Sequence, residues 1–582
     1  MTVDILTQLN SQQKEAVLYH RGSSIILAGA GSGKTRVLIS KVVNLIKNYQ
    51  VDPKSILMIT FTNKAAGEMK ARIGVSYSLG YVGTFHSFCA RVLRIDGQFA
   101  GLKKNFLIYD EEDQIGVVKS VLKKINLGKK YTPSYLLNRI SSAKNQLISP
   151  EKYLEVFSDY ASSDTNMVYQ AYQKELKENN ALDFDDLINV TIKLFQKNKQ
   201  VLEKYQDKYR YILVDEFQDT NFVQYLLTKL LGQKYKNVTV VGDFSQSIYS
   251  WRGAEIKNLE KFEKDFPNTA VFYLEKNYRS TQSILNFAYS VISKNETHPI
   301  LSLFTDKKGG EEVVFYEASN EEDEGIYLAN LINDLKPGHR LDEMAVLYRT
   351  NAQSRAIEEV FLHYGIPYVL IGGTRFYERK EVKDVLSYLR LLVNPVDKLS
   401  KERILKLGKT RFEKFKKYYE ENKDSVEDKN TEKSIEEVFQ ATDYLKQYNP
   451  DDEEDYSRLE NIKELKSVAV AFPSLPQFLE QIALVESEYF EGEKGAKNKN
   501  GIRLMTLHQA KGLEFPVVFI VGVEEGILPH SRSFDDIYSL EEERRLFYVG
   551  ITRAKERLFI TYTRQRFIFG SRNYSMKSRF LE

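Results

Sequence analysis

The chain has 582 residues, of which 42% are hydrophobic and 28% are charged. At roughly 150 residues per domain this length predicts about four folded units, and the composition excludes a disordered or fibrous chain. The 83 basic and 80 acidic side chains leave a net charge of +3. That balance excludes a uniformly basic surface, although a local basic groove for nucleic acid is compatible with it.

Cysteine content and hydropathy narrow the class further. Cys89 is the only cysteine in the sequence, which excludes a disulfide framework and a multi-cysteine zinc site. No apolar stretch approaches the ~18 residues that a membrane span needs, and the first ten residues lack the basic lead of a secretion signal. We therefore expect a cytoplasmic protein without a membrane partner.

Short apolar runs, each followed by polar or glycine-rich residues, recur along the chain. Such runs are typical of parallel strands that are buried on both faces of a sheet. They lie at 24–28, 56–61, 211–214 and 238–241, and later at 344–348, 368–371, 504–507, 517–521 and 558–562. Residues 35–49 carry apolar side chains at helical spacing. The pattern predicts two α/β sheets of the phosphate-binding kind.

Two segments interrupt the alternation of strands and helices. Residues 88–180 are rich in Lys and Tyr, and residues 395–500 are strongly charged and include the acidic run 451–455. Both have a helical pattern without a strand signal. We interpret them as helical insertions into the sheet domains.

The stretch 28–35 reads Ala-Gly-Ala-Gly-Ser-Gly-Lys-Thr, after a predicted strand and before a predicted helix. In a phosphate-binding loop of this kind, backbone N–H groups and the positive helix end hold polyphosphate. Lys34 would reach the β and γ oxygens and Thr35 would hold Mg²⁺, whereas the alternative is a glycine-rich turn with a chance Lys-Thr. The expected nucleotide contacts are Ala30, Gly31, Ser32, Gly33, Lys34, Thr35 and Arg36.

A pair of carboxylates ends the predicted strand 211–214. Asp215 can hold the metal through water, and Glu216 can orient or deprotonate the attacking water. Alone, such a pair is more often an ordinary surface turn. Together with Lys34 it predicts an ATPase or a GTPase.

Further motifs follow one another in a fixed order. They are Gln-Gln-Lys-Glu-Ala at 12–16, Thr-Phe-Thr-Asn-Lys-Ala-Ala at 60–66, Gly-Thr-Phe-His-Ser at 83–87, Leu-Asp-Phe-Asp-Asp-Leu at 182–187, Asp-Glu-Phe-Gln-Asp at 215–219, Gly-Asp-Phe-Ser-Gln-Ser-Ile-Tyr-Ser-Trp-Arg-Gly-Ala at 242–254, Asn-Tyr-Arg-Ser at 277–280, Leu-Tyr-Arg-Thr-Asn-Ala at 347–352, Thr-Leu-His-Gln-Ala-Lys-Gly-Leu-Glu-Phe at 506–515 and Tyr-Val-Gly-Ile-Thr-Arg-Ala at 548–554. In this the chain resembles the UvrD/PcrA/Rep family of superfamily 1 DNA helicases from about residue 8 to its end.

The resemblance implies two RecA-like P-loop NTPase domains, each with a parallel sheet and a mostly helical insertion. The first domain would comprise 1–87 and 181–275 with the insertion 88–180. The second would comprise 276–394 and 501–582 with a shortened insertion, 395–500. It also implies ATP and Mg²⁺ in the cleft between the domains, and 3′→5′ movement along single-stranded DNA.

The resemblance also implies roles for individual residues around ATP. Gln13 would read the adenine edge, Tyr278 would stack on the base and Glu514 would contact the ribose. Gln246 would sense the γ-phosphate or its water. The expected arginine fingers are Arg279 and Arg553, while Lys34, Thr35, Asp215 and Glu216 keep the roles given above.

A candidate DNA track contains the only tryptophan, Trp251, between Tyr249 and Arg252. A large aromatic beside an arginine can stack a base and hold the next phosphate, although a core position is the commoner fate of a tryptophan. The family motifs add Phe61, Asn63, His86, Arg349 and Phe376 as DNA contacts. His86 is equally compatible with a structural histidine.

Two departures from the family pattern leave the function open between related alternatives. Ser245 replaces a usual aspartate, for which we expect altered hydrogen bonding with ATPase activity retained, and the second insertion is short. The leading hypothesis is an ATP-dependent helicase acting on single-stranded DNA and single-/double-strand junctions, with repair or replication proteins as partners. The alternatives are a translocase that strips proteins from DNA and a non-enzymatic DNA scaffold. We expect a monomer, or a dimer on DNA.

Overall fold

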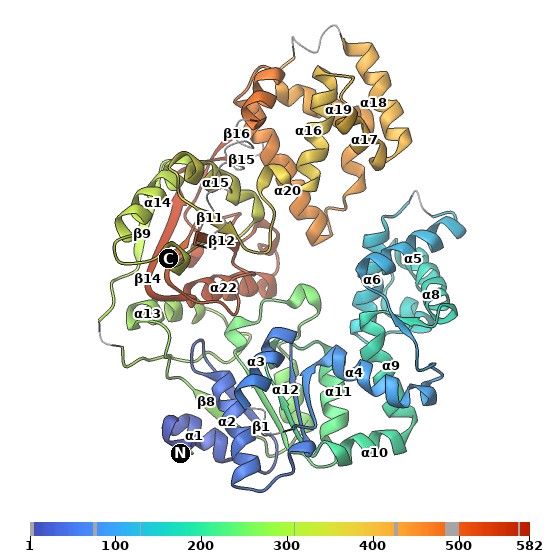
Figure 1. Cartoon of the computed structure of the whole chain (residues 1–582), viewed down its shortest axis with the longest axis vertical. Coiled ribbons are helices and arrows are strands. Elements are labelled where there is room, and N and C mark those ends of the chain that lie inside the picture. The colour runs from blue at the N-terminus through green and yellow to red at the C-terminus, as the bar shows by residue number, and fades with distance from the viewer. Residues whose placement is uncertain are drawn as a thin grey trace. The chain divides into compact units, whose positions relative to one another are not determined.

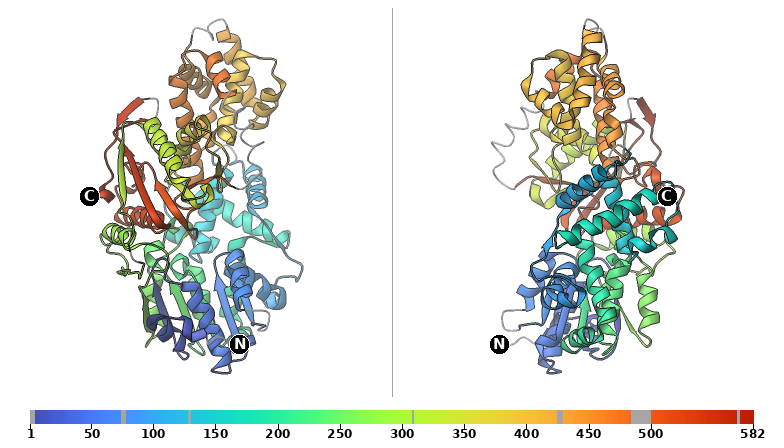
Figure 2. Two further views of the ribbon diagram at one scale, coloured as in Figure 1. Left: turned by 60° about the vertical axis from the view of Figure 1, so that its left-hand side comes forward. Right: turned by 90° about the vertical axis from the view of Figure 1, so that its right-hand side faces the viewer.

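The computed structural model describes residues 5–73, 78–127, 130–307, 309–423, 429–483, 500–568 and 571–582. The chain forms two units. Unit 1 holds the chain up to Arg279 together with Ile292–Asp306, and unit 2 holds Ser280–Val291 and the chain from Lys307 onward. Each unit is built around its own sheet, as Figure 1 and the two side views of Figure 2 show.

The sheet of unit 1 has six parallel strands in the order β3-β2-β6-β7-β1-β8. They are β1 (Ser24–Ala28), β2 (Ile56–Thr60), β3 (Tyr81–Thr84), β6 (Tyr211–Val214), β7 (Val238–Gly242) and β8 (Ala270–Leu274). The four runs predicted in this part of the chain all form strands, whereas β3 and β8 lie outside the predicted set.

Successive residues of a strand face opposite sides of the sheet, and helices cover both sides. Ile26 and Met58 belong to one apolar core, and their neighbours Ile25 and Leu57 belong to the other. The helices on the first side are α1 (Ser11–Leu18), α2 (Lys34–Lys47) and α3 (Asn63–Ile73); those on the second are α4 (Phe85–Asp96), α9 (Phe184–Lys197), α10 (Lys199–Lys208), α11 (Phe222–Gly232) and α12 (Asn258–Asp265). This burial on both sides explains the continuously apolar strands.

The first insertion is a small helical bundle with its own apolar core. Its helices are α5 (Glu111–Lys124), α6 (Pro133–Asn145), α7 (Tyr153–Val156) and α8 (Ser162–Glu178). The expectation of a segment without strands is wrong at one place, because β4 (Leu107–Ile108) pairs in parallel with β5 (Ala181–Leu182). A two-residue strand is too short to leave a periodic pattern in the sequence.

The sheet of unit 2 also has six parallel strands, in the order β11-β12-β10-β13-β14-β9. They are β9 (Val314–Ala318), β10 (Met344–Tyr348), β11 (Tyr368–Leu370), β12 (Ile502–Thr506), β13 (Phe515–Ile520) and β14 (Ala554–Thr563), and a hairpin of β15 (Gln565–Ile568) and β16 (Ser571–Tyr574) follows. The sheet domain of unit 2 also contains the helices α13 (Gln282–Ile292), α14 (Glu321–Leu335), α15 (Ser354–His363) and α22 (Ile537–Ile551). Two parallel sheets with helical insertions confirm the predicted fold class.

The second insertion contains α17 (Lys398–Leu407), α18 (Lys409–Asn422), α19 (Thr431–Thr442) and α20 (Glu453–Val470). Its apolar core also includes Phe376 and much of α16 (Lys380–Val393), which the expected boundaries place before the insertion. The boundaries themselves remain a prediction.

A buried ionic cluster joins the first insertion to the sheet domain. Lys144, in the last turn of α6, lies 2.6 Å from Asp183 and 2.9 Å from Asp186, at the start of α9. Asp185 accepts a hydrogen bond of 2.6 Å from the hydroxyl of Ser141. Two of the three carboxyl groups thus pair with one ammonium, and burial, with the charge of Asp183, raises the pKa of Asp185 to about 7.

This cluster predicts a pH-dependent stability. The folded chain holds a proton on Asp185 that the unfolded chain releases near pH 4, so this group lowers the free energy of unfolding as the pH rises from about 4 to about 7. Asp185→Asn removes the titration. We expect the melting temperature of the variant to fall less than that of the unmodified chain between pH 5 and pH 7.5, by about 2 °C or more.

The control is Glu112→Gln, which neutralises an exposed carboxylate of α5. It should keep the original pH profile in the same thermal melts. Equal profiles for the Asp185 variant and the unmodified chain would show that Asp185 is ionised throughout this range.

Candidate functional site

The functional groups of unit 1 gather where its strands end. The loop 29–33 follows β1, Asp215 follows β6 and Asp243 follows β7, and these strands are neighbours in the order β6-β7-β1. Since parallel strands end at one edge of a sheet, the loop and both acidic motifs lie together there. This edge is the usual ligand-binding edge of an α/β sheet.

The loop conformation depends on its glycines. Gly31 and Gly33 have φ of 64° and 86°, in the left-handed region that other residues adopt only with strain. A Cβ atom on Gly31 would lie 2.7 Å from Asn277 Nδ2, and that amide donates a 2.6 Å hydrogen bond to the Ala30 carbonyl. Ser32 closes the loop by donating to the carbonyl of Gly29 over 2.8 Å.

The loop leads directly into α2, whose first residues are Lys34 and Thr35, followed by the exposed Arg36. The N–H groups in the first turn of a helix have no partner within the helix, and the helix dipole makes this end positive. Backbone and side chains therefore present donors and positive charge together. The loop and this turn form a cradle for an anion such as a polyphosphate.

Both residues assigned to the base are attached to this loop. Gln13 is buried and donates from Nε2 to the Ser32 carbonyl over 2.9 Å. The backbone N–H of Tyr278 donates to the Gly31 carbonyl over 3.0 Å, and its hydroxyl accepts from Asn10 over 2.9 Å. The structure thus brings Gln13 and Tyr278 to the phosphate loop.

Asn277 is a residue of this site that sequence reasoning missed. Besides the bond to Ala30, its side-chain oxygen accepts from the backbone N–H of Arg279 over 2.7 Å, so it joins the loop to the predicted finger residue. Its place in the motif 277–280 was the available signal, but a contact between residues so far apart in the sequence leaves no periodicity.

A buried carboxylate, Asp243, connects the predicted catalytic residues. Its Oδ2 lies 3.7 Å from Lys34 Nζ and accepts a 2.6 Å hydrogen bond from Gln246 Nε2. Its Oδ1 accepts from the backbone N–H of Ser245 over 3.2 Å. Asp243, to which the sequence analysis gives no role, therefore fixes the distance between the loop lysine and the predicted phosphate sensor.

Asp215 and Glu216 lie beside this carboxylate. Gln218 donates to Glu216 Oε2 over 2.6 Å and accepts from the backbone N–H of Asp243 over 3.0 Å, which joins the two acidic motifs. Glu216 has φ of 50°, an uncommon value for a non-glycine residue and one often found at functional sites.

The residues fit a divalent cation. Among the described residues, Asp215 Oδ1 is buried without a hydrogen-bond donor, and burial together with the charge of Glu216 raises the pKa of Asp215 to about 7. A buried carboxylate oxygen without a donor is a ready ligand for Mg²⁺, which prefers oxygen. The hydroxyl of Thr35, in the first turn of α2, supplies a second oxygen of the required kind.

Ser245, the departure from the family pattern, has a specific partner. Its hydroxyl lies 3.1 Å from Nε2 of His298, a buried histidine of the segment Ile292–Asp306. The serine thus ties a distant segment of unit 1 to the motif 242–254. Gln246 keeps its contact with Asp243 beside this changed residue.

Two predicted nucleotide contacts belong to unit 2. Glu514 is exposed and forms a 2.8 Å ion pair with Lys555. Arg553 is 1% exposed and donates to the carbonyls of Val549 (2.9 Å) and Leu513 (3.2 Å). Their roles toward a nucleotide remain predictions.

The predicted DNA contacts of unit 1 also follow strand ends. Phe61 and Asn63 come after β2, and His86 is at the start of α4 after β3. Burial lowers the pKa of His86, whose ring contacts Phe184 edge-on. Whether His86 is structural or contacts DNA remains a prediction. Two strands lie between β2 and β1 and three between β3 and β1, which places these positions three to four strand spacings from β1, about 14–19 Å at ~4.8 Å a spacing.

The tryptophan belongs to a turn after β7. Trp251 is 51% exposed, and its ring lies 6.4 Å from that of Tyr249 in an edge-to-face arrangement. The side chain of Arg252 is outside the described part of the structure. An exposed, supported indole is available for stacking, unlike the core tryptophan of the alternative reading.

The two DNA contacts predicted in unit 2 are engaged within the protein. Arg349 forms a bidentate pair with Glu543, with contacts of 2.8–3.1 Å. Although burial opposes ionisation, this guanidinium holds the pKa of Glu543 below its ordinary value. Phe376 is fully buried in the core shared with the second insertion. Contacts of Arg349 and Phe376 with DNA remain predictions.

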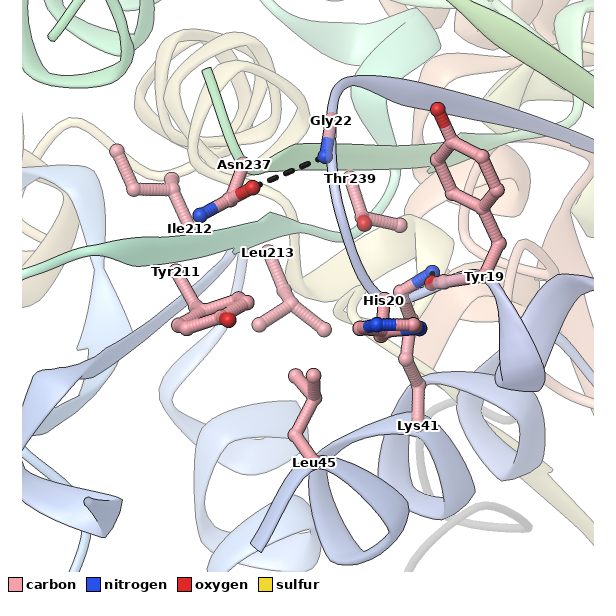
Figure 3. A pocket seen from close by; sticks show the side chains of 10 residues that line it. All are labelled: Tyr19, His20, Gly22, Lys41, Leu45, Tyr211, Ile212, Leu213, Asn237 and Thr239. Carbon is pink, nitrogen blue, oxygen red and sulfur yellow. Dashed lines mark hydrogen bonds between the residues drawn. The ribbon is translucent and has the colours of Figure 1, made fainter. Parts of the chain in front are cut away.

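A small pocket lies at the opposite edge of the sheet, beside the starts of β6 and β7 (Figure 3). Its volume of about 10 Å³ holds about one water molecule. Lys41 lines it and donates to the carbonyls of Ala16 (2.9 Å) and Tyr19 (2.6 Å) at the end of α1, while burial lowers its pKa to about 7. This lysine anchors the helix that carries Gln13; it is not a second ligand site.

Comparison with known families covers nearly the whole chain. The UvrD/REP helicase N-terminal domain matches residues 9–267. The UvrD-like helicase C-terminal domain matches two stretches, 272–419 and 408–565, which overlap within the second insertion. No helix in the described ranges is both long and apolar enough to cross a bilayer.

Two proteins that are similar to this chain over nearly its whole length share the same name. The proteins named ATP-dependent DNA helicase PcrA from Staphylococcus epidermidis and Bacillus subtilis are 42% and 44% identical to this chain, and each alignment covers 99% of the chain and 86% of the relative. These alignments are 634 and 632 residues long. Because the chain has 582 residues, the relatives carry residues within the aligned region that it lacks.

The geometry of the loop predicts the effect of one methyl group. Gly31→Ala would place its Cβ within 2.7–2.8 Å of Asn277 and Arg279 at a positive φ. The strain and clash should distort the phosphate cradle, and we expect ATP affinity to fall at least about tenfold. Equilibrium binding of a fluorescent ATP analogue measures this.

Gly67→Ala, in α3, is the matched control, because an added Cβ meets no atom within 4 Å there. It should bind ATP as the unmodified chain does. Unchanged binding by the Gly31 variant would mean that the loop does not hold phosphate.

Proposed function

Because the chain belongs to the UvrD/Rep family of helicases, we propose that it is an ATP-dependent DNA helicase that moves 3′→5′ along single-stranded DNA. The arrangement of Lys34, Asp215, Glu216 and Asp243 at one sheet edge carries this proposal. It supplies a phosphate cradle, a metal ligand and a base in a single unit.

ATP binding would use the loop and the first turn of α2. In this structure the Lys34 ammonium pairs with Asp243. Because the lysine side chain is flexible, the ammonium could leave this pair and contact the β and γ oxygens of ATP. Gln13 and Tyr278, both attached to the loop, would hold the base. A nucleobase held by Gln13 and Tyr278 would therefore also affect the conformation of the phosphate loop.

Mg²⁺ would be held by Thr35 and Asp215 and would supply positive charge to the phosphate oxygens. The protein itself positions the general base: Gln218 donates a hydrogen bond to the Glu216 carboxylate, which would orient and deprotonate the attacking water. Gln246, which donates a hydrogen bond to Asp243, would contact the γ-phosphate or its water. Arg279 and Arg553 are assigned to transition-state charge, an effect of about 10³–10⁵ in rate for arginine fingers.

The exposed Trp251 would stack on a base, with phosphates held by a local groove. We assign single-stranded DNA and its junctions with duplex as the substrate, with repair or replication proteins as partners. The chain would act in the cytoplasm as a monomer, or as a dimer on DNA.

The second candidate is a translocase that removes proteins from single strands and opens duplex weakly. The observation that favours it is that the relatives carry residues that this chain lacks. We place them in the second insertion, where the two C-terminal family matches overlap. A smaller insertion offers less surface for duplex backbone.

The decisive experiment compares duplexes that carry a 3′ or a 5′ single-stranded tail. We expect ATP-dependent opening from the 3′ tail, because a motor moving 3′→5′ on that strand meets the duplex. Lys34→Ala should abolish hydrolysis and opening, by at least about 10²-fold, and keep DNA binding. Opening from 5′ tails alone would refute the direction, and strong DNA-stimulated ATPase activity with little opening would select the translocase.

Trp251→Ala tests the DNA surface separately. Losing one stacking ring should weaken binding to single-stranded oligonucleotide by about 1–3 kcal/mol, measured by fluorescence anisotropy. Tyr273→Ala is the control, because Tyr273 is similarly exposed (49%) but lies on the edge strand β8. Equal affinities for both variants would show that Trp251 does not contact DNA.

A further inference from the structure

The motif 182–187 has a structural role that the proposed chemistry leaves unused. Asp183 accepts from Lys144 and, over 2.9 Å, from the hydroxyl of Tyr172 in α8, while Asp185 accepts from Ser141. Lys144 and Ser141 both belong to α6. The motif therefore clamps the last turn of α6, and it fixes the residue that ends this helix, Asn145.

Asn145 contacts Asn221, which lies two residues after the acidic motif 215–219. Its Oδ1 accepts a 2.8 Å hydrogen bond from Nδ2 of Asn221. Asn221 is buried, and its own Oδ1 caps α11 by accepting from the backbone N–H of Gln224 over 3.0 Å. Asn221 thus caps the start of α11 and also donates a hydrogen bond to the last residue of α6.

The turn that carries Trp251 meets the same two residues. Gly253 follows the tryptophan with φ of 83°, and a Cβ there would lie 3.7 Å from the Cβ atoms of both Asn145 and Asn221. Just beyond the turn, Glu255 and Asn258 donate to the carbonyl of Thr220 over 3.0 Å and 2.8 Å. The DNA-facing turn therefore holds the residue directly before Asn221.

From Thr220 the path to the carboxylate is short. Its hydroxyl and backbone N–H both donate to the carbonyl of Phe217, over 2.7 Å and 3.1 Å, which closes the turn Phe217–Asp219. That turn contains Gln218, the donor to Glu216. Every step from the turn of Trp251 to Glu216 is a direct contact inside unit 1.

We propose that Asn145 and Asn221 are positioning residues that make ATP hydrolysis respond to DNA: their hydrogen bond, held by the motif 182–187, fixes the start of α11 and the turn of Gln218 when a strand occupies the Trp251 turn. The inference rests on the proposed function. Neither asparagine touches ATP, so the pair affects the DNA-stimulated rate and leaves DNA-independent hydrolysis to Lys34, Asp215 and Glu216.

The test is Asn145→Leu, which keeps the size of the side chain and removes its acceptor. We expect the stimulation of ATPase activity by single-stranded DNA to fall about tenfold, the upper effect of one hydrogen bond. DNA-independent hydrolysis and affinity for the oligonucleotide should stay unchanged. Asn145→Asp keeps the acceptor and should restore stimulation, and Asn138→Leu, on an exposed turn of α6, is the matched control.

Asn221→Ser gives a second approach from the other side of the bond. Serine is a good helix cap but is too short to reach Asn145, so the same loss is expected, and the double variant with Asn145→Leu should be no worse than either single one. Full stimulation in Asn145→Leu, or equal losses of basal and stimulated rates, would overturn the inference. An unmodified chain without ATPase activity would instead refute the proposed function itself.

Discussion

The contact between Lys34 and Asp243 is the interaction on which the candidate site depends. It joins the loop after β1 to the strand end of β7, and through Gln246 and Gln218 it fixes the groups expected to meet the γ-phosphate and its water. The buried carboxyls of Asp215 and Asp243 and the half-buried carboxyl of Glu216 lie at the same sheet edge, and Asp243 pairs with the Lys34 ammonium. Burial and the charge of Glu216 raise the pKa of Asp215, because buried negative charge is costly unless a cation joins it; a divalent cation would relieve this cost.

Unit 1 contains a second cluster of the same composition, which shows how structure distinguishes a ligand site from an anchor. Each cluster has one ammonium and three carboxyl groups: Lys144 pairs with Asp183 and Asp186, and Lys34 pairs with Asp243. At the anchor Asp183, Asp185 and Asp186 each accept from side chains of the insertion, and the pKa of Asp185 is raised to about 7 by burial and by the charge of Asp183. At the site near Lys34 a buried oxygen of Asp215 has no donor among the described residues. The first cluster is complete by itself, whereas the second is complete only with a cation.

Sequence reasoning predicts the parts of this structure that depend on local pattern. The loop before α2, the carboxyl pair after β6 and most strands follow from apolar runs and short motifs, because each is encoded by neighbouring residues. It could not give Asn277, Asp243 or the Asn145–Asn221 bond their roles, since these depend on side chains that meet only after the sheet has formed. Phe376 shows the converse: it lies at a position assigned to DNA, yet the structure buries its ring.

The second insertion, which we expect to be shorter than in the family, bears on the choice between helicase and translocase. Its core contains Ile404, Phe415, Phe439, Leu465 and Phe478, all buried together with α16, so the insertion retains a packed apolar core that it shares with this helix. What a smaller body loses is surface, and therefore contacts to duplex DNA rather than stability. Opening one base-pair step costs on average about 1.4 kcal/mol, which is little beside the energy of ATP hydrolysis. Translocation along one strand needs no contact between the insertion and duplex DNA. Efficient opening does need one, because the remaining surface of the insertion must still hold the junction.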